Sequence, residues 1–371
     1  MSQVIAMICL NCLSAGSQPS DVLVYVGTYT SRGSEGVYVY RLDPATGGLK
    51  PVGKSPHLTD PSFVAVDPKG RCIYAVREGG KAGAVVALAR NPATNELAIL
   101  NEQPSGGQGP CYVTVDREGR FALAANYGSG SVALLPIAED GRLQPASSVI
   151  QHEGSSVNRS RQKGPHAHSI TLDPANRFAY APDLGIDKIM IYRLDREQGK
   201  LVPNDPPFAK CEPGSGPRHF TFHPDGKHAY VIEELSCTVT AFDYDAATGA
   251  LKSLQKISTL PKDFKGNSTC AEVQVHPSGR FLYGSNRGHD SIASFAVDTK
   301  TGELRLLGFT PTQGKNPRNF AIDPSGTFLL AANQDGNSIV SFRINQETGE
   351  LTPTGQVCQV SMPVCVKMVK P

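Results

Sequence analysis

Tryptophan is absent from the 371 residues, and neither charge sign predominates. Without tryptophan the chain cannot carry the Trp-Asp dipeptide that marks WD repeats. The 36 basic and 34 acidic residues leave a formal net charge of +2, with no basic stripe and no acidic tail. Beyond the first 20 residues, no stretch approaches the ~20 apolar residues of a membrane-spanning helix. We therefore expect neither a nucleic-acid partner nor a membrane partner.

Several short catalytic motifs are also missing. The chain has no G-x-S-x-G elbow, no H-E-x-x-H, no Walker A loop and no G-x-G-x-x-G after a strand. These absences argue against a serine hydrolase with a nucleophile elbow, a zinc protease, a P-loop protein and a dinucleotide-binding protein.

The nine cysteines are odd in number and scattered along the chain. Cys72, Cys111, Cys237 and Cys270 lie within or beside expected strands, where a free cysteine behaves as a small hydrophobic residue. We expect mostly free, buried thiols. Cys9-x-x-Cys12 has metal or redox spacing, but no second pair lies at zinc-site distance, so we interpret it as incidental.

Residues 1–20 stand apart from the rest of the sequence, and we expect them to form a leader or a disordered N-terminus. They contain a short apolar run, "VIAMICL", followed by "LSAGS", which resembles a cleavage region. The positively charged start of a secretory signal is missing. We therefore expect a cytoplasmic protein, or an exported, periplasmic one if the apolar stretch is a signal.

One phrase recurs six times, at intervals of about 50 residues. Each copy is an alternating apolar strand, a turn of the D/H-P-x-G type and a second apolar strand. The copies are "FVAVDPKGRCIYAVRE" (63–78), "YVTVDREGRFALAANY" (112–127), "SITLDPANRFAYAPDL" (169–184), "HFTFHPDGKHAYVIEE" (219–234), "EVQVHPSGRFLYGSNR" (272–287) and "NFAIDPSGTFLLAANQ" (319–334).

A third and a fourth strand follow each copy, often linked by T-G-E-L or a similar turn. Four strands per repeat indicate the blade of a β-propeller. The chain starts with "DVLVYVGTYT", which matches a second strand, and ends with "MPVCVKMV", which matches a first strand. We therefore predict one all-β domain over residues 21–371. It is a seven-bladed propeller of four antiparallel strands per blade, and the C-terminal strand completes the N-terminal blade.

Polar residues recur where the first strand of a repeat begins and where the second ends. In a propeller blade the first strand lines the central tunnel and the second runs back beside it, so these two places meet at one mouth. The candidate residues there are His168, Asp183, Arg218, His219, Glu234, Glu272, Arg287, Arg318 and Gln334.

The mixture of residue types in this set indicates a site for an anionic ligand with acid–base groups. Arginine can grip an anion through two hydrogen bonds, and carboxylates and histidine can move protons. A salt-bridge lattice that merely fills the mouth is the alternative, because buried charges are costly unless paired or used.

The stretch "GPHAHSI" departs from the repeat, because its entry is longer than in the other copies. His168 occupies the position that Arg218 and Arg318 hold elsewhere. The extra residues, including His166, are expected to bulge the strand entry and aim a side chain into the mouth. A metal held by the two histidines is an alternative, but no further His or Cys is placed to help, so we expect no metal and activity that survives a chelator.

Four segments together resemble the seven-bladed lactonase family, which includes bacterial propeller-type 6-phosphogluconolactonases and the fungal 3-carboxy-cis,cis-muconate lactonising enzyme. They are "GPHAHSI", "GPRHFTFHPDGKHAYVIEEL", "VHPSGRFLYGSNRG" and "NPRNFAIDPSG". The resemblance covers about residues 21–371 and implies the seven-bladed fold and lactone chemistry without a redox cofactor. It also implies catalytic roles for His168, Arg218, Glu234 and Arg287, with Arg318 nearby.

The function that this resemblance favours is hydrolysis of a sugar lactone. The leading candidate reaction is hydrolysis of 6-phospho-D-glucono-1,5-lactone to 6-phospho-D-gluconate. Glu234 or His168 would be the general base, Arg218 and Arg287 would stabilise the oxyanion, and Arg318 would help to hold the phosphate. The remaining mouth residues, including His166, are expected to bind substrate, and the longer entry leaves open which histidine acts.

Two alternatives stay open at this point. One is a muconate-type lactonising enzyme, and the other is a non-catalytic propeller that uses its face as a protein-binding platform. The expected partner is a small, anionic lactone, and the protein is expected to be a monomer or a homodimer.

Overall fold

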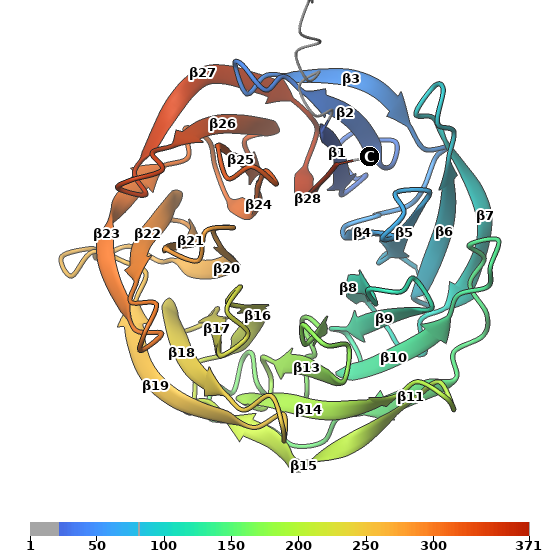
Figure 1. Ribbon diagram of the computed structural model, residues 1–371, viewed down its shortest axis with the longest axis horizontal. Helices are drawn as coiled ribbons and strands as arrows, with labels where there is room; N and C mark the ends of the chain where they lie inside the picture. The colour runs from blue at the N-terminus through green and yellow to red at the C-terminus, as the bar shows by residue number, and fades with distance from the viewer. Residues whose placement is uncertain (1–21, 81, 371) are drawn as a thin grey trace, which may run out of the picture.

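A computed structural model of the protein describes residues 22–80 and 82–370. In this part of the chain, 28 strands form seven four-stranded antiparallel sheets around a central axis (Figure 1). The predicted seven-bladed propeller is confirmed. The expectations for residues 1–20 fall outside the described residues. Among the residues described, no helix has the length and apolar character needed to cross a membrane.

Each blade has the same radial order, and the strands are named here from the axis outward. The innermost strands are β4 (Val64–Val66), β8 (Pro110–Val115), β12 (Thr171–Leu172), β16 (Pro217–Phe222), β20 (Thr269–Val275), β24 (Pro317–Ile322) and β28 (Pro363–Val369). The second strands are β1 (Val22–Thr28), β5 (Cys72–Arg77), β9 (Phe121–Asn126), β13 (Phe178–Asp183), β17 (His228–Glu233), β21 (Phe281–Arg287) and β25 (Phe328–Asn333).

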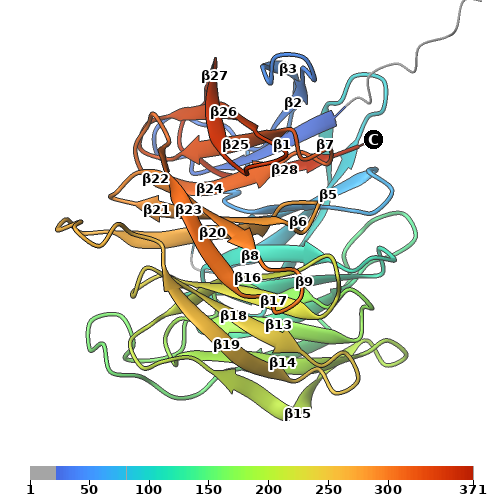
Figure 2. The same cartoon turned by 60° about the vertical axis from the view of Figure 1, so that its left-hand side comes forward.

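The third strands are β2 (Tyr38–Leu42), β6 (Ala84–Arg90), β10 (Ser131–Pro136), β14 (Lys188–Asp195), β18 (Thr238–Tyr244), β22 (Ser291–Val297) and β26 (Ser338–Ile344). The outer strands are β3 (Leu49–Lys54), β7 (Leu97–Pro104), β11 (Ser148–Gln151), β15 (Lys200–Lys210), β19 (Leu251–Ser258), β23 (Leu304–Pro311) and β27 (Leu351–Gln359). Figure 2 shows β19 and β23 crossing the rim of the disk.

The ring is closed by the two ends of the chain. β28 pairs with β1 in one antiparallel sheet, with Leu23 opposite Val369 and Val26 opposite Val366. Cys365 and Val366 of this strand have no exposed surface. The predicted pairing of the C-terminal strand with the N-terminal blade is therefore confirmed, and the closure leaves no open edge between the first and last blades.

The core lies between neighbouring blades. The second strands are almost wholly buried, whereas the outer strands alternate between exposed and partly buried residues. Tyr283 of β21, for example, packs in one cluster with Phe320 and Phe342 of the next blade. The seven described cysteines are free, and five of them are buried, as expected for small core residues.

T-G-x-L turns link three blades to the preceding blade, through Gly249, Gly302 and Gly349. A buried tyrosine of the second strand donates its hydroxyl to the carbonyl oxygen of the turn glycine in the following blade, as in Tyr230 to Gly302 at 2.9 Å and Tyr283 to Gly349 at 2.9 Å. Gly302 and Gly349 have φ of 73° and 75°. A side chain there would be strained and would collide with the aromatic ring of His228 at Gly302 or of Phe281 at Gly349, so the repeated glycine is a packing requirement.

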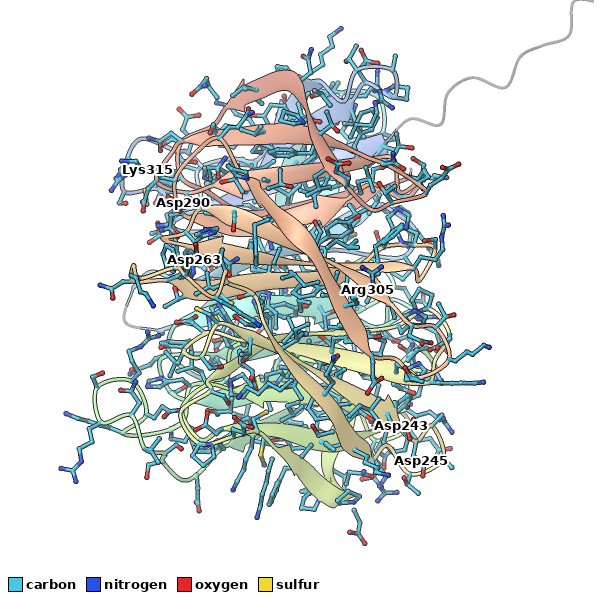
Figure 3. All side chains as sticks on the ribbon, turned by 90° about the vertical axis from the view of Figure 1, so that its left-hand side faces the viewer. Asp243, Asp245, Asp263, Asp290, Arg305 and Lys315 are labelled. Atoms are coloured by element: carbon cyan, nitrogen blue, oxygen red, sulfur yellow. The ribbon has the colours of Figure 1, made fainter. Side chains whose placement is uncertain are left out.

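The disk has two different faces. Seen edge-on in Figure 3, Asp263, Asp290 and Lys315 lie at one face, and Asp243 and Asp245 lie at the other. We call the first the mouth face, because the inner strands begin there. We call the second the far face, where the turns between first and second strands lie.

Candidate active site at the mouth face

Two rings of equivalent positions line the mouth of the tunnel. The first ring comes from residues at or just before the start of the inner strands and contains Ser62, Cys111, His168, Arg218 and Arg318. The second ring comes from the residues at or just past the ends of the second strands and contains Glu78, Tyr127, Glu234 and Arg287.

β-Bulges put the two ring arginines in place. The register of β16 against β17 shifts at Arg218, and that of β24 against β25 shifts at Arg318, so each arginine is an extra residue on its strand. A bulge bends the strand and re-aims the side chain that it carries. Each bulge follows a proline, Pro217 or Pro317, which suits the first position of a strand.

Glu234 is the hub of the site. Its Oε2 accepts from Arg218 Nε at 3.0 Å and lies 2.8 Å from Arg287 Nη2. Its Oε1 accepts from Arg161 Nη2 at 2.6 Å. One nearly buried carboxylate therefore holds three guanidinium groups from three different segments.

Electrostatics fix the protonation of this hub. Burial by itself would raise the pKa of Glu234, but the charges of Arg287 and Arg218 and the hydrogen bond from Arg161 outweigh it and hold the pKa well below its usual range. Burial, with the neighbouring charges of Arg287 and Arg318, lowers the pKa of Arg218 to about 10. Glu234 is thus an anion and Arg218 a cation at neutral pH.

His168 lies beside this cluster as a neutral imidazole. Its ring stands edge-on to Tyr127, with centroids 5.3 Å apart, and its Nδ1 lies 3.6 Å from Cys111 Sγ. Burial and the charge of Arg218 hold the pKa of His168 well below 6.5. A neutral imidazole in a cavity can accept a proton.

A cavity of about 310 Å³ opens at the mouth between these groups. Its walls include Glu78, Tyr127, His168, Glu234, Arg287 and Arg318. The size suits a small molecule, and the wall carries more cationic than anionic side chains, since Arg161 also lies in it.

Arg318 is the cation of this cavity that has no counter-charge in contact. Among the described residues its side chain makes no hydrogen bond and no ion pair, and its guanidinium lies over the ring of Tyr29, 5.6 Å from the centroid. The carboxylates of Glu78 and Glu234 lie near enough to act against burial and raise its pKa, but neither contacts it. Arg218, Arg287 and Arg161 share one carboxylate, so Arg318 is the arginine left free to bind a ligand anion.

His219 and Glu272 lie deeper than the cavity. Arg218 Nη1 lies 3.1 Å from His219 Nε2, and His219 Nδ1 lies 3.2 Å from Glu272 Oε2, although without the alignment of a hydrogen bond. Burial raises the pKa of Glu272 to about 7, and burial with the charge of Arg218 lowers that of His219 well below 6.5. Glu272 lines a separate cavity of about 330 Å³ further along the tunnel, with Lys367.

Three other candidates are engaged outside the mouth cavity. His166 stacks on Tyr127 with centroids 4.5 Å apart, and its Nδ1 lies 2.8 Å from the carbonyl oxygen of Tyr127. Asp183 contacts His152 Nδ1 at 2.7 Å and accepts from the backbone N–H of His166. Gln334 bonds through its backbone N–H to the carbonyl of Asn316. In this geometry His168 faces the cavity, and His166 and Asp183 support the loop that carries it.

Arg161 is the main site residue that the repeat pattern missed. It lies in the irregular segment between β11 and β12, which no other blade matches, and it also donates to the Tyr127 hydroxyl at 3.2 Å. The extra length of this repeat was the available signal, but length alone does not say which side chain reaches the mouth.

Within the described residues, one group of three ligand-type side chains comes together, and it comprises His223, Asp225 and His228 at the turn between β16 and β17. That turn belongs to the far face, away from the cavity. A larger cavity of about 510 Å³ also opens at the far face, around Asp67, Glu118 and Gly141.

Comparison with known proteins assigns the chain to a family. The sequence pattern of the family described as Lactonase, 7-bladed beta-propeller, matches residues 23–368. The protein belongs to the seven-bladed β-propeller lactonase family. The resemblance that the four sequence segments carried is thereby confirmed.

Individual relatives of this lactonase family are similar along most of their length. The chain is 40% identical over 299 residues to the 6-phosphogluconolactonase of Bacillus subtilis strain 168, covering 81% of this chain and 84% of that protein. It is 34% identical over 306 residues to a 6-phosphogluconolactonase of Formosa agariphila, covering 81% and 86%.

Solved structures agree with this assignment. The periplasmic gluconolactonase of Pseudomonas aeruginosa superposes with a TM-score of 0.89 at 34% identity, covering 95% of this chain and 100% of that chain. A structure from Bacteroides fragilis superposes with a TM-score of 0.89 at 37% identity, covering 95% and 99%.

Proposed function

We propose that this protein hydrolyses a sugar lactone, with 6-phospho-D-glucono-1,5-lactone as substrate and 6-phospho-D-gluconate as product. Membership of the lactonase family and the names of the two bacterial relatives support this choice. The single observation that carries it is Arg318, a guanidinium without a counter-charge in contact, in a small cavity that also holds a neutral histidine.

Substrate binding begins with the anion. The phosphate lies against Arg318, which can donate two parallel hydrogen bonds to it. Arg161 comes from a loop segment and is partly exposed, so it can turn from Glu234 toward the same group. The sugar lactone then lies over the side chains that line the mouth, with its carbonyl group toward Arg218 and Arg287.

In the chemical step, water attacks the lactone carbonyl carbon while His168 accepts the proton of the water. The carbonyl oxygen becomes an oxyanion, which the guanidinium groups of Arg218 and Arg287 stabilise. The tetrahedral intermediate collapses by breaking the bond from the carbonyl carbon to the ring oxygen. His168 returns its proton to that oxygen, and the free acid ionises and releases one proton.

Glu234 acts as a positioning residue in this mechanism. Three arginines hold its pKa too low for an effective base at neutral pH, so the general base is assigned to His168. The depressed pKa of His168 comes partly from Arg218 and Arg318. A bound anion would offset those charges and raise the basicity of the imidazole when substrate is present.

Which lactone the site meets depends on the cellular compartment. The Pseudomonas relative is a periplasmic gluconolactonase. If residues 1–20 direct export, the same site would meet unphosphorylated D-glucono-1,5-lactone, because sugar phosphates are intracellular metabolites. In the muconate-type alternative, Arg318 would bind a substrate carboxylate while a second carboxylate adds to a carbon–carbon double bond, and His168 or Glu234 would transfer the proton to the neighbouring carbon.

A lactone panel tests this proposal. We expect fastest turnover of 6-phospho-D-glucono-1,5-lactone, slower turnover of D-glucono-1,5-lactone and none of muconates, read as proton release above the spontaneous rate. Faster turnover of the unphosphorylated lactone would contradict the phosphate assignment. No turnover of any lactone, with conversion of a muconate, would contradict hydrolysis.

A further inference from the structure

Three ligand-type side chains meet at the far face, at the turn between β16 and β17. His223 and His228 flank the turn and are buried, and Asp225 lies between them with its side chain 24% exposed. His228 pairs with Asp243 of β18, and Asp243 lies at the far face in Figure 3. β16 and β17 each run for six residues, so the turn lies about 20 Å from the mouth.

The tautomer of His223 is fixed by the neighbouring blade. Its Nε2 lies 2.8 Å from the carbonyl oxygen of Gly279, so Nε2 carries hydrogen and donates. Nδ1 of a neutral ring then presents a lone pair, and it lies 3.0 Å from Asp225 Oδ1, which is also an acceptor. Metal-bound histidine commonly has this arrangement, with the other ring nitrogen donating to a backbone carbonyl.

The contact between these two acceptors is incompletely compensated. The backbone N–H of Asp225 donates to His223 Nδ1 at 3.2 Å, which is long for a hydrogen bond, and Oδ1 of Asp225 accepts from the backbone N–H of Lys227 at 2.7 Å. These bonds partner each acceptor separately, and neither places a hydrogen between the two. The other carboxylate oxygen, Oδ2, lies 2.8 Å from Nδ1 of His228. A cation between the three groups would turn the unfavourable contact into a favourable one.

The following blade holds the same turn without the cluster. His276 matches His223, with Nε2 2.9 Å from the carbonyl of Gly326. There Ser278 stands in place of Asp225 and bonds to His276 Nδ1 at 2.8 Å, because a hydroxyl can supply the hydrogen. Phe281 stands in place of His228. In these two blades the histidine contacts the glycine carbonyl of the neighbouring blade, and this contact needs neither an aspartate nor a second histidine.

We infer that His223, Asp225 and His228 bind a divalent first-row transition metal ion, with Zn²⁺ and Co²⁺ as suitable ions. One ligand atom from each residue lies within 4.8 Å of the others. Two imidazole nitrogens and one carboxylate oxygen suit these ions better than Mg²⁺ or Ca²⁺, which take oxygen ligands. With three protein ligands, a fourth position faces water beside Asp225.

The proposed metal site is structural and takes no part in lactone chemistry. A bound ion would tie β16 to β17 and would hold His228 against the turn at Gly302 of the next blade. Binding to the folded state alone raises stability with metal concentration. Lactone turnover at the mouth should be the same with chelator and with metal, so failure of this inference is distinguishable from failure of the proposed function.

The test compares the chelator-treated protein with the double variant Asp225→Ser, His228→Phe, which copies the turn of the following blade. Titration with Co²⁺ followed by visible absorption, and with Zn²⁺ by calorimetry, should give one more bound ion in the unaltered protein. Its melting temperature should rise with Zn²⁺, and that of the double variant should not. Subtracting the ions bound by the double variant from those bound by the unaltered protein removes the contribution of cysteines elsewhere, since both proteins contain them.

A milder variant guards against misfolding. Asp225→Asn keeps the size of the side chain and should weaken metal binding by at least about 10-fold. Equal metal stoichiometry and affinity in all three proteins would overturn the inference. The inference would also be overturned if the wild-type protein took up no Co²⁺ and NMR showed both ring nitrogens of His223 protonated. A proton on Nδ1 would then relieve the contact with Asp225 in place of a metal ion.

Discussion

Arg218 Nε donates to Glu234 Oε2 at 3.0 Å, and both side chains are almost wholly buried. Arg218 is the second residue of the inner strand of its blade, and Glu234 follows the second strand of the same blade. Breaking a buried pair by removing one partner leaves an uncompensated charge. The ion pair therefore fixes the orientation of the Arg218 guanidinium. It also keeps the Glu234 carboxylate from acting as a base.

Glu234→Gln should lower kcat by about 100-fold or more, because a misplacement of about 1 Å in a reacting group can cost that factor. The amide keeps the shape but takes the negative charge from between Arg161, Arg218 and Arg287. These cations would then repel one another. Steady-state kinetics on the best lactone should show the loss in kcat rather than in KM alone.

A matched control for this variant lies one residue earlier. Glu233 contacts Thr238 and Lys256 on the other side of the strand. Glu233→Gln should therefore keep near-normal kcat. If both variants lose activity equally, the loss reports general damage to β17 and not the arginine cluster.

Arg318→Ala should raise KM for the phosphorylated lactone by at least about 10-fold, since one hydrogen bond to a charged group contributes about 1.5–3 kcal/mol. The effect on D-glucono-1,5-lactone should be small, because that substrate has no phosphate. Arg318→Lys should recover part of the binding but not the paired geometry. An equal rise in KM for both lactones would contradict a phosphate contact.

Glu272 predicts a pH dependence of stability. Its pKa is about 7 in the folded protein and near 4.5 when unfolded. Between these values the folded state holds a proton that the unfolded state has released, so this group makes the fold less stable as pH rises. Glu272→Gln cannot titrate. From pH 5 to pH 8 the unfolding free energy of the wild type should therefore fall by roughly 2–3 kcal/mol relative to the variant.

Comparing the wild type with Glu272→Gln cancels the contributions of the other titratable groups to the pH dependence of the unfolding free energy. His168 and His219 have lowered pKa values and pull stability in the opposite direction below pH 6.5, but they are present in both proteins. Denaturant unfolding at several pH values gives the difference. Parallel curves for the two proteins would show that Glu272 keeps an ordinary pKa.

Deleting residues 363–371 should abolish cooperative unfolding of the native fold. The deletion removes β28, exposes the edge of β1 and loses the burial of Val364, Cys365 and Val366, roughly 5 kcal/mol in total. Deleting only residues 370–371 should leave the melting temperature within a few degrees. A nine-residue deletion that melts like the full chain would contradict closure of the ring by this strand.

The fold was predictable because each blade repeats the same local pattern, and the split repeat at the two ends specified the closure. The mouth positions were predictable for the same reason. Arg218 and Arg318 share one offset from the turn, and so do Glu234 and Arg287. What the offset did not show is that the two arginines sit in bulges.

Two outcomes at the site depended on features that the repeat does not encode. Asp183 lies one position earlier than the equivalents of Glu234, and alternation along a strand turns its carboxylate to the opposite side. Arg161 comes from a segment without a counterpart in the other blades. Its contact with Glu234 depends only on the path of that loop.

The most direct test of the central claim is kcat of Arg218→Ala on the best lactone, measured by proton release and with folding checked by circular dichroism. The loss should be about 10²–10³-fold, as for one oxyanion donor, with Arg218→Lys only partly restored. Arg280→Ala is the control, since Arg280 is exposed and contacts the backbone of Gln346 at the far face, and it should keep near-normal kcat. A folded Arg218→Ala protein that turns over the lactone at the wild-type rate would contradict the account.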